Sequence, residues 1–397
     1  MKGGRMSKIL VSLVSEQTLP NVLFIRELIY NNIIVDKYYF ISTIKMEENK
    51  KTQSIIEASL IKEENCKIII VENDNLENIE DTLRKLAFDH NDKLLVNITC
   101  GTKIMSLGIY NFFKEKGAEI FYLSIGTNTY SKIYPYFGND KSGLKYNINL
   151  QDYFKSYGIN INNDTNFLFE KDPQKTKEFF QFFAKNKEKY HKVFNFFRNN
   201  RDIKGSINFD ELDDKILLDK KAEKNDDNYI LDKLLLETFI NEQSLNKTFN
   251  KDLCVYYSGG WFEEFVYLLL KERIKINNSI SVNIIINRYN KLQNELDVCF
   301  VYKNKLFVIE CKTGLKTKDG NLFTETIYKI AALKKDFGLD VNSFLFTLDD
   351  SLRDKNTGEF LKEKKDKADL FNIILIDKKI LKDEIMLKKE FFDKIFI

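Results

Sequence analysis

Two carboxylates and a lysine lie in apolar runs between positions 294 and 314, where a charged side chain is costly to bury. Asp297 belongs to the run ELDVCFVY, while Glu310 and Lys312 belong to the run LFVIECK. Both runs are rich in β-branched and aromatic residues, and KN between them suits a two-residue turn, so they predict a β-hairpin. In that register Asp297 lies directly opposite Glu310. Lys312 shares the face of Glu310 because side chains alternate along a strand.

This arrangement of charges points to a metal site. Two carboxylates opposed on one face of a hairpin repel each other and destabilise it. A divalent cation between them converts the repulsion into coordination, and hard oxygen ligands suit Mg²⁺ or Mn²⁺. Lys312 would then lie beside the cation, placed to stabilise a metal-bound hydroxide or the charge that builds on a phosphate. The alternative is a solvated edge hairpin in which Lys312 simply pairs with Glu310.

The flanking sequence predicts the elements that hold these residues. Upstream, YYSGGWFEEFVYLLLKERIK breaks at a glycine pair and then has the apolar spacing of an amphipathic helix. Glu263 borders the apolar stripe of that helix and can reach the same cation or its water, with Glu264 as the competing candidate. Downstream, TETIYKIAALKKDFG predicts another helix and NSFLFTL predicts a strand.

The order helix, hairpin, helix, strand is that of the PD-(D/E)xK nucleases, and this part of the chain resembles their restriction-enzyme-like form. The matching sequences are GGWFE, ending at position 263, NELDV around position 297, and ECK at 310–312. The resemblance implies a role for each of five residues: metal ligands Asp297, Glu310 and the main-chain carbonyl of Cys311, catalytic lysine Lys312, and accessory acid Glu263.

Residues 7 to about 150 alternate apolar strands with amphipathic helices, from the strand KILVSLV to the strand EIFYLSIG. Continuous apolar strands between helices predict a parallel, doubly wound α/β sheet. Ligands of such sheets bind at the carboxyl ends of the strands, where the free N–H groups of a helix N-terminus favour a phosphate. The chain has no G-x-G-x-x-G or Walker sequence, so a dinucleotide cofactor or ATP hydrolysis is poorly supported.

Two strand-to-helix junctions, SEQTLPN and TCGTK, carry polar residues suited to such a ligand. In the second junction Gly101 permits close approach of the backbone, Thr99 and Thr102 supply hydroxyl groups, and Lys103 adds a cation. Ordinary helix capping is the alternative explanation for both junctions. The predicted ligand-binding residues are Ser15, Glu16, Gln17, Thr18, Thr99, Cys100, Gly101, Thr102 and Lys103.

The two junctions together resemble those of the CARF domain, the CRISPR-associated Rossmann-like sensor of cyclic oligoadenylates. VSLVSEQTLPNV and VNITCGTKIMSL look like its two ligand-binding motifs, with one departure. Close relatives have two glycines before T-K, whereas this chain has Cys100 followed by Gly101. Joined to the ECK nuclease, the whole chain resembles the CARF nucleases of type III CRISPR systems, the Can and Card proteins.

That family resemblance implies a homodimer activated by a cyclic oligoadenylate. A cyclic ligand with two-fold symmetry suits an isologous interface to which each subunit contributes the same two loops. Cyclic tetra-adenylate is the expected activator because it matches the nearest relatives, and the hexa-adenylate stays open. The resemblance also implies single-stranded DNA or RNA as substrate, with nicking of duplex DNA as a further activity.

The length of 397 residues suits two domains and a connector. We expect a CARF domain over 1–150, a helical connector over 151–250 whose phenylalanines pack a core, and a PD-(D/E)xK nuclease domain over 251–397. The five cysteines show no C-x-x-C spacing and indicate reduced thiols in a cytoplasmic protein. No signal peptide is expected, and no apolar run approaches the ~20 residues that cross a membrane.

The sequence therefore predicts a ligand-gated, metal-dependent endonuclease. Lys316 and Lys318, just after the ECK strand, either follow a phosphate backbone or belong to an ordinary solvated loop. Two other functions remain open. A non-enzymatic, ligand-sensing DNA-binding regulator would bind without cleavage and be indifferent to Mn²⁺, and a ring nuclease would degrade the cyclic oligoadenylate in the N-terminal site. DNA versus RNA and Mn²⁺ versus Mg²⁺ are likewise undecided.

Overall fold

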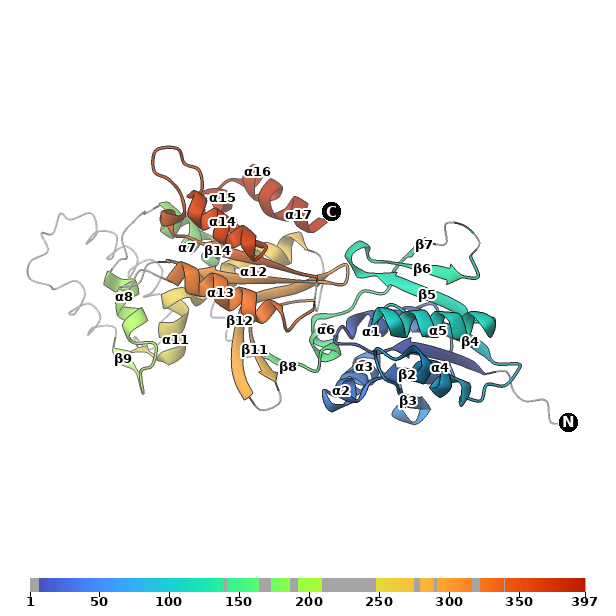
Figure 1. Cartoon of the computed structure of the whole chain (residues 1–397). Coiled ribbons are helices and arrows are strands. Elements are labelled where there is room, and N and C mark those ends of the chain that lie inside the picture. Colours follow the sequence, from blue (N-terminus) through green and yellow to red (C-terminus); the bar gives the residue numbers. More distant parts are fainter. Residues whose placement is uncertain are drawn as a thin grey trace, which may run out of the picture.

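The chain folds into two α/β units, each built on its own sheet (Figure 1). Lys316, Lys318 and much of the predicted connector lie outside the described residues. The computed structural model describes residues 7–136, 138, 141–163, 173–185, 192–208, 248–274, 279–288, 291–315, 322–338 and 340–396.

The N-terminal sheet has seven strands in the order β3-β2-β1-β4-β5-β6-β7. The first five strands along the chain are parallel and the last two are antiparallel, so the predicted doubly wound sheet is confirmed. The strand order reverses between β1 and β4, which is where a ligand site is expected. The strands are β1 (Lys8–Leu13), β2 (Lys37–Ser42), β3 (Cys66–Ile70), β4 (Lys93–Asn97), β5 (Glu119–Ser124), β6 (Thr129–Tyr134) and β7 (Lys141–Gly143).

The helices of this unit begin where the sequence signals predict. Pro20 lies in the first turn of α1, and the Thr102 hydroxyl caps α5 by accepting from the Met105 N–H at 3.2 Å. Gly108 lets α5 approach α4 closely, because a Cβ there would lie 2.9 Å from Leu76 Cδ1. The helices are α1 (Leu19–Tyr30), α2 (Ile44–Glu48), α3 (Lys51–Ser59), α4 (Leu76–Arg84), α5 (Lys103–Glu115) and α6 (Leu150–Ser156).

The C-terminal sheet has six strands in the order β15-β14-β13-β12-β11-β8. Its edge strand β8 comes from the segment predicted to be a helical connector, and it pairs antiparallel with β11. The strands β12 and β13 form the predicted hairpin, and β14 continues the sheet parallel to β13. The strands are β8 (Asn160–Asn163), β11 (Ile280–Arg288), β12 (Lys291–Tyr302), β13 (Lys305–Lys312), β14 (Val341–Thr347) and β15 (Ile373–Ile376).

The hairpin has the predicted register. Tyr302 pairs with Lys305 and Val298 pairs with Ile309, which brings Asp297 and Glu310 together at the next position. Lys303 and Asn304 have φ values of 47° and 62°, as a two-residue turn between twisted strands requires. The predicted hairpin that carries Asp297 and Glu310 is therefore confirmed.

Aromatic side chains join the middle of the chain to the C-terminal unit. Phe180 stacks on Phe265 with ring centroids 3.8 Å apart, and Phe179 meets Trp261 edge-on at 4.7 Å. These phenylalanines pack in a core, as predicted. The helices concerned are α7 (Pro173–Lys185), α8 (Lys192–Asn199) and α12 (Trp261–Arg273).

The remaining helices of the unit frame the other strands. All five cysteines of the chain are free, in keeping with the sequence. In the part of the chain that the structure describes, no helix combines the length and apolarity needed to span a membrane. The remaining helices of the C-terminal unit are α11 (Lys251–Val255), α13 (Leu322–Lys334), α14 (Lys362–Leu370), α15 (Lys378–Lys382), α16 (Glu384–Leu387) and α17 (Asp393–Phe396).

One hydrophobic cluster spans both units, and α6 contacts α3 on one side and β8 and β12 on the other. Asn304, at the tip of the hairpin, is 1% exposed. Its side chain donates to Asn128 Oδ1 at 2.8 Å and to the Tyr146 carbonyl at 2.9 Å, and accepts from the Ile148 N–H at 2.8 Å. The hairpin that carries the acids is thus fixed at its tip to the N-terminal unit.

Candidate functional sites

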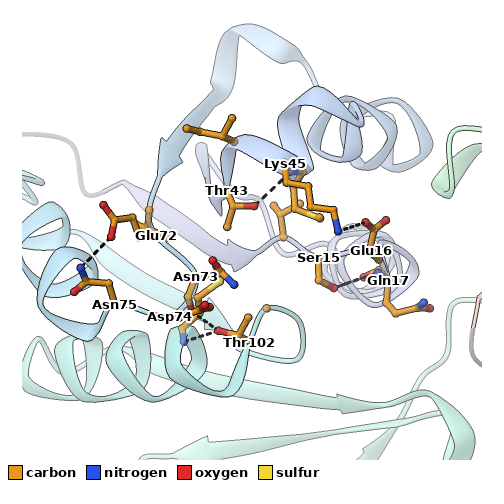
Figure 2. A pocket seen from close by; sticks show the side chains of 16 residues that line it. Ser15, Glu16, Gln17, Thr43, Lys45, Glu72, Asn73, Asp74, Asn75 and Thr102 are labelled. Atoms are coloured by element: carbon orange, nitrogen blue, oxygen red, sulfur yellow. Dashed lines mark hydrogen bonds and ion pairs between the residues drawn. The ribbon is translucent and has the colours of Figure 1, made fainter.

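A cavity of about 780 Å³ opens at the carboxyl ends of β1 to β4 (Figure 2). Its walls come from residues 14–17 after β1, 43–46 after β2 and 71–75 after β3, and from Gly101, Thr102 and Met105 around the start of α5. The cavity therefore lies at the reversal in strand order, where an open α/β sheet binds its ligands.

Five of the nine predicted ligand-binding residues line this cavity. They include Gly101, whose φ of +83° and whose packing against Leu13 both favour a residue without Cβ. An added Cβ would lie 3.3 Å from Leu13 Cδ1. The five are Ser15, Glu16, Gln17, Gly101 and Thr102.

The hydroxyl groups of Thr18 and Thr99 bond to protein partners behind the cavity wall. Thr18 is fully buried and donates to the Ser156 carbonyl. Thr99 Oγ1 donates to Asn97 Oδ1 at 2.6 Å and accepts from the Leu123 N–H at 2.8 Å. These two residues brace the junctions, and a direct ligand contact by either stays a prediction.

Cys100 and Lys103 also lie outside the cavity lining. The buried Cys100 thiol donates to the Gln17 carbonyl at 3.1 Å, and burial raises its pKa to about 12. This bond ties the two junctions together. Gly101, rather than Cys100, occupies the position with positive φ, so the backbone here needs only one glycine. Lys103 is exposed in the first turn of α5.

The sequence did not single out the cavity residues that follow β2 and β3. Lys45 Nζ lies 3.8 Å from Glu16 Oε1, and Lys51 Nζ lies 3.1 Å from Glu16 Oε2 (Figure 2 shows Lys45 beside Glu16). The segment 72–75 faces them across the cavity. Their position after parallel strands is the signal that would have identified them.

In the C-terminal unit, oxygens of the three predicted metal ligands converge on one cationic group. Lys312 Nζ lies 3.2 Å from Asp297 Oδ2, 2.7 Å from Glu310 Oε1 and 3.2 Å from the Cys311 carbonyl oxygen. Asp297 is 5% exposed and Glu310 is 1% exposed. The predicted cluster of Asp297, Glu310 and Lys312 is therefore assembled in the folded chain.

These residues fit a divalent cation. Two carboxylates and a main-chain carbonyl form the hard oxygen set that Mg²⁺ or Mn²⁺ prefers. Among the described residues, no group of three or more His, Cys, Asp or Glu side chains is placed to hold a metal ion. The set therefore reaches three protein ligands only through the Cys311 carbonyl, with water and phosphate left to complete the shell.

The acids of this cluster disfavour one another's charge. Burial, followed by repulsion from Glu310, raises the pKa of Asp297 to about 6. Burial, followed by repulsion from Asp297, raises the pKa of Glu263 to about 8. Burial alone would lower the pKa of Lys312, but Asp297 and Glu310 outweigh it and raise this pKa above its ordinary value. An added cation would favour the ionised form of these carboxyl groups, so the raised pKa values of Asp297 and Glu263 indicate a site suited to a cation.

The structure distinguishes the two adjacent glutamates of α12. Glu264 is fully buried and accepts a hydrogen bond from the Tyr256 hydroxyl at 2.6 Å, so it faces the core. Glu263 faces the cluster, because Asp297 is the charged group that affects its pKa most. Consecutive helical residues point about 100° apart, which separates the two carboxylates. The contact with Tyr256 argues against Glu264, and the role of Glu263 as accessory acid stays a prediction.

Lys329 is the residue of this cluster that sequence reasoning missed. It lies on α13, and its Nζ is 2.8 Å from Oε1 and 3.0 Å from Oε2 of Glu310. Local sequence offered no signal, because a lysine in TETIYKIAALKK is ordinary on a helix surface. Only the packing of α13 against the sheet reveals the contact.

Comparisons with known families decide the identity of both units. The family described as Card1 CARF domain matches residues 9–153, and the family described as Card1-like, endonuclease domain matches residues 251–379. The chain joins a CARF domain to a Card1-like endonuclease domain. The cavity lies in the CARF domain, and the cluster around Glu310 lies in the endonuclease domain. The exact domain boundaries and the roles of single residues stay predictions.

Two solved structures share the fold of the whole CARF-endonuclease chain. Protein VC1899 from Vibrio cholerae is 19% identical, with a TM-score of 0.71, and 98% of each chain is covered. Can2 from Sulfobacillus thermosulfidooxidans, solved in complex with cyclic tetra-adenylate, is 21% identical, with a TM-score of 0.67, covering 96% of this chain and 99% of Can2. No curated protein matches the chain in sequence.

Proposed function

We propose that the chain is a cytoplasmic endonuclease of type III CRISPR defence. A cyclic oligoadenylate binds the CARF domain and activates metal-dependent cleavage of single-stranded DNA or RNA in a PD-(D/E)xK site. The observation that carries the proposal is the convergence of Asp297, Glu310 and Cys311 oxygens beside Lys312, inside a domain of the Card1-like endonuclease family. The Can2 complex supports cyclic tetra-adenylate as the activator.

Asp297, Glu310 and the Cys311 carbonyl would hold the cation. When bound, a divalent cation lowers the pKa of water and polarises a phosphate oxygen. Lys312 remains charged at neutral pH because the two carboxylates raise its pKa, so it can stabilise the charge that develops on the phosphate. Glu263, with a pKa near 8 in the cation-free protein, is suited to exchange a proton with water at neutral pH.

Arginines beside the cluster support a polyanionic substrate. Arg201 Nε donates to Ser258 Oγ at 2.5 Å, directly ahead of α12. The same guanidinium lies within electrostatic reach of Arg198 and of Glu263. Cationic groups beside an acidic site neutralise backbone phosphates without regard to sequence. This placement favours non-specific cleavage of nucleic acid.

Apolar residues around the cavity support a homodimer. Ile44 lines the cavity and is 66% exposed, and Leu107, on the helix after the second junction, is 50% exposed. Exposed apolar groups grouped around a ligand site are typical of surfaces covered in an assembly. An isologous contact would join two cavities around one cyclic ligand with two-fold symmetry.

Contacts between the two domains support activation by the ligand. The Tyr157 hydroxyl donates to Gln17 Oε1, in the cavity wall, at 3.3 Å. It also packs against Gly338, at φ +111°, where an added Cβ would collide with that hydroxyl. Tyr153 donates to the Phe337 carbonyl at 2.9 Å. Phe337 and Gly338 follow α13, so displacement of Gln17 by a ligand acts on the helix that carries Lys329.

The test is a cleavage assay on labelled single-stranded DNA and RNA. Mn²⁺ or Mg²⁺ and cyclic tetra-adenylate are each added or withheld, and wild type is compared with Glu310→Ala. We expect degradation only when ligand, cation and Glu310 are all present. If both proteins bind the ligand and the substrate stays intact throughout, also with cyclic hexa-adenylate, the chain is a regulator. Linear products from labelled ligand alone would indicate a ring nuclease.

A further inference from the structure

A lysine outside the hairpin binds the most buried acid of the endonuclease site. Lys329 Nζ contacts both carboxylate oxygens of Glu310, at 2.8 and 3.0 Å. Lys312 Nζ reaches the same Oε1 at 2.7 Å, and the Glu310 side chain is only 2% exposed. Two ammonium groups from two different elements, β13 and α13, therefore neutralise one carboxylate.

The position of Lys329 on α13 leaves it open to solvent. The helix packs against the sheet through a buried stripe, and Lys329 borders that stripe with 39% of its side chain exposed. Lys312 already neutralises Glu310 and is less exposed, at 27%. Lys329 is thus the ammonium group that a molecule arriving from solvent can reach most easily. The buried residues of the stripe are Phe323, Thr326, Ile327, Ile330 and Leu333.

A divalent cation on Glu310 would compete with Lys329. Glu310 keeps a second ammonium partner in Lys312, and the Lys329 side chain is 39% exposed, so a divalent cation can take the place of Lys329 at this carboxylate. Lys329 would then face solvent beside the site without its carboxylate. The oxygen of a nucleic-acid phosphate is the natural new partner for such an ammonium group.

Resting on the nuclease function proposed above, we propose that Lys329 is a further substrate-binding lysine of the active site. Glu310 holds it in the cation-free protein. When Glu310 serves a divalent cation, the Lys329 ammonium group binds a phosphate oxygen of the nucleic acid. Lys329 also lies on α13, and the segment that follows this helix contacts Tyr153 and Tyr157 through Phe337 and Gly338.

The first test measures Mn²⁺ affinity of the full chain without nucleic acid or cyclic ligand. Lys329→Met removes the competing ammonium group, so we expect Mn²⁺ to bind about 2- to 5-fold more tightly. The matched control is Lys335→Met, an exposed lysine one residue beyond α13, which should bind Mn²⁺ as the wild type does. Unchanged or weaker Mn²⁺ binding by Lys329→Met overturns the exchange at Glu310.

The second test measures turnover on single-stranded DNA with cyclic tetra-adenylate at saturating Mn²⁺. Lys329→Met should lower turnover about 10- to 100-fold, despite its tighter Mn²⁺ binding. Lys329→Arg should retain part of the activity, because it keeps the charge, and Lys335→Met should keep all of it. Turnover at the wild-type rate in Lys329→Met overturns the substrate contact. If the wild type cleaves nothing, the proposed nuclease function fails, and the Mn²⁺ titration alone decides the exchange.

Discussion

The CARF cavity and the endonuclease cluster use polar groups in opposite ways. The cavity is wide, about 780 Å³, and the Thr18 and Thr99 hydroxyls near it bond to the protein rather than face the opening. The endonuclease cluster is compact, with Asp297 and Glu310 almost completely buried and the Lys312 ammonium within 3.2 Å of both.

The CARF cavity is therefore suited to recognise its ligand by shape, whereas the endonuclease cluster is suited to act through charge. The cavity depends on backbone conformation, as at Gly101, and its conspicuous carboxylate, Glu16, is met by two lysines. The endonuclease cluster depends on buried carboxylates that lysines neutralise and that a divalent cation would share. Changes of charge should therefore have large effects in the cluster, whereas changes of backbone freedom should have the larger effects around the cavity.

Removal of the central charge of the cluster should have the largest effect. In Lys312→Met we expect cleavage to fall about 100- to 1000-fold, because the developing phosphate charge loses its nearest protein cation. Ligand affinity, measured by calorimetry, should not change, since the partners of Lys312 given above all lie in the endonuclease domain. Lys362→Met, an exposed lysine at the start of α14, is the control and should cleave as the wild type does. Equal losses in both variants would contradict the assignment.

Detaching the hairpin from the CARF domain should have the next largest effect. Asn304→Gly keeps the positive φ of the turn but removes three hydrogen bonds to the CARF domain. Each such bond contributes about 0.5–1.5 kcal/mol, so the free energy of unfolding should fall by about 2–3 kcal/mol in denaturant titrations. Asn372→Gly, at an exposed turn with φ 52°, is the matched control. If Asn372→Gly loses as much stability as Asn304→Gly, the hydrogen bonds of Asn304 do not fix the hairpin to the CARF domain.

A backbone change at the cavity should have a moderate effect. Gly101→Ala forces a side chain into a left-handed conformation at a cost of about 1–2 kcal/mol and crowds the buried Leu13. We expect lower stability and weaker binding of cyclic tetra-adenylate in thermal-shift titrations. Gly143→Ala has open space around its Cβ and should behave as the wild type. Wild-type ligand binding by Gly101→Ala would show that shape matters less than proposed.

A pH dependence of stability is also expected in the cation-free protein. The pKa of Glu263 is raised from 4.5 to about 8 on folding, so the folded chain binds this proton more tightly than the unfolded chain. Ionised Glu263 therefore destabilises the fold progressively as the pH rises from about 4.5 to 8. Relative to Glu263→Gln, the wild type should lose stability over that range in thermal melts with EDTA. Parallel curves would contradict the burial of Glu263 beside Asp297.

The sequence was informative where local rules determine structure. The hairpin register followed from alternation and a two-residue turn, and it brought Asp297 and Glu310 together without any tertiary information. The parallel sheet followed from apolar strands between helices. Its strand ends located the cavity, although the segments after β2 and β3 were overlooked.

The remaining features depend on packing between distant elements. Glu263 and Glu264 both border one helical stripe, so the sequence does not distinguish them. In the folded chain Glu264 accepts a hydrogen bond from Tyr256. Lys329 approaches Glu310 from another element, and polar Asn160–Asn163 becomes an edge strand only by pairing with β11. Such contacts leave no periodic or short-range trace in the sequence.

The coupling between cavity and cluster is the central claim, and Gly338→Ala tests it most directly. Gly358→Ala, at φ +70° in the same domain, carries similar backbone strain without contact to Tyr157 and serves as control. Ligand affinity and ligand-stimulated cleavage are measured together in both variants. We predict that Gly338→Ala binds cyclic tetra-adenylate within about threefold of the wild type but loses at least about tenfold in stimulated cleavage, about 1.4 kcal/mol in activation free energy. Stimulation equal to that of Gly358→Ala would contradict the account.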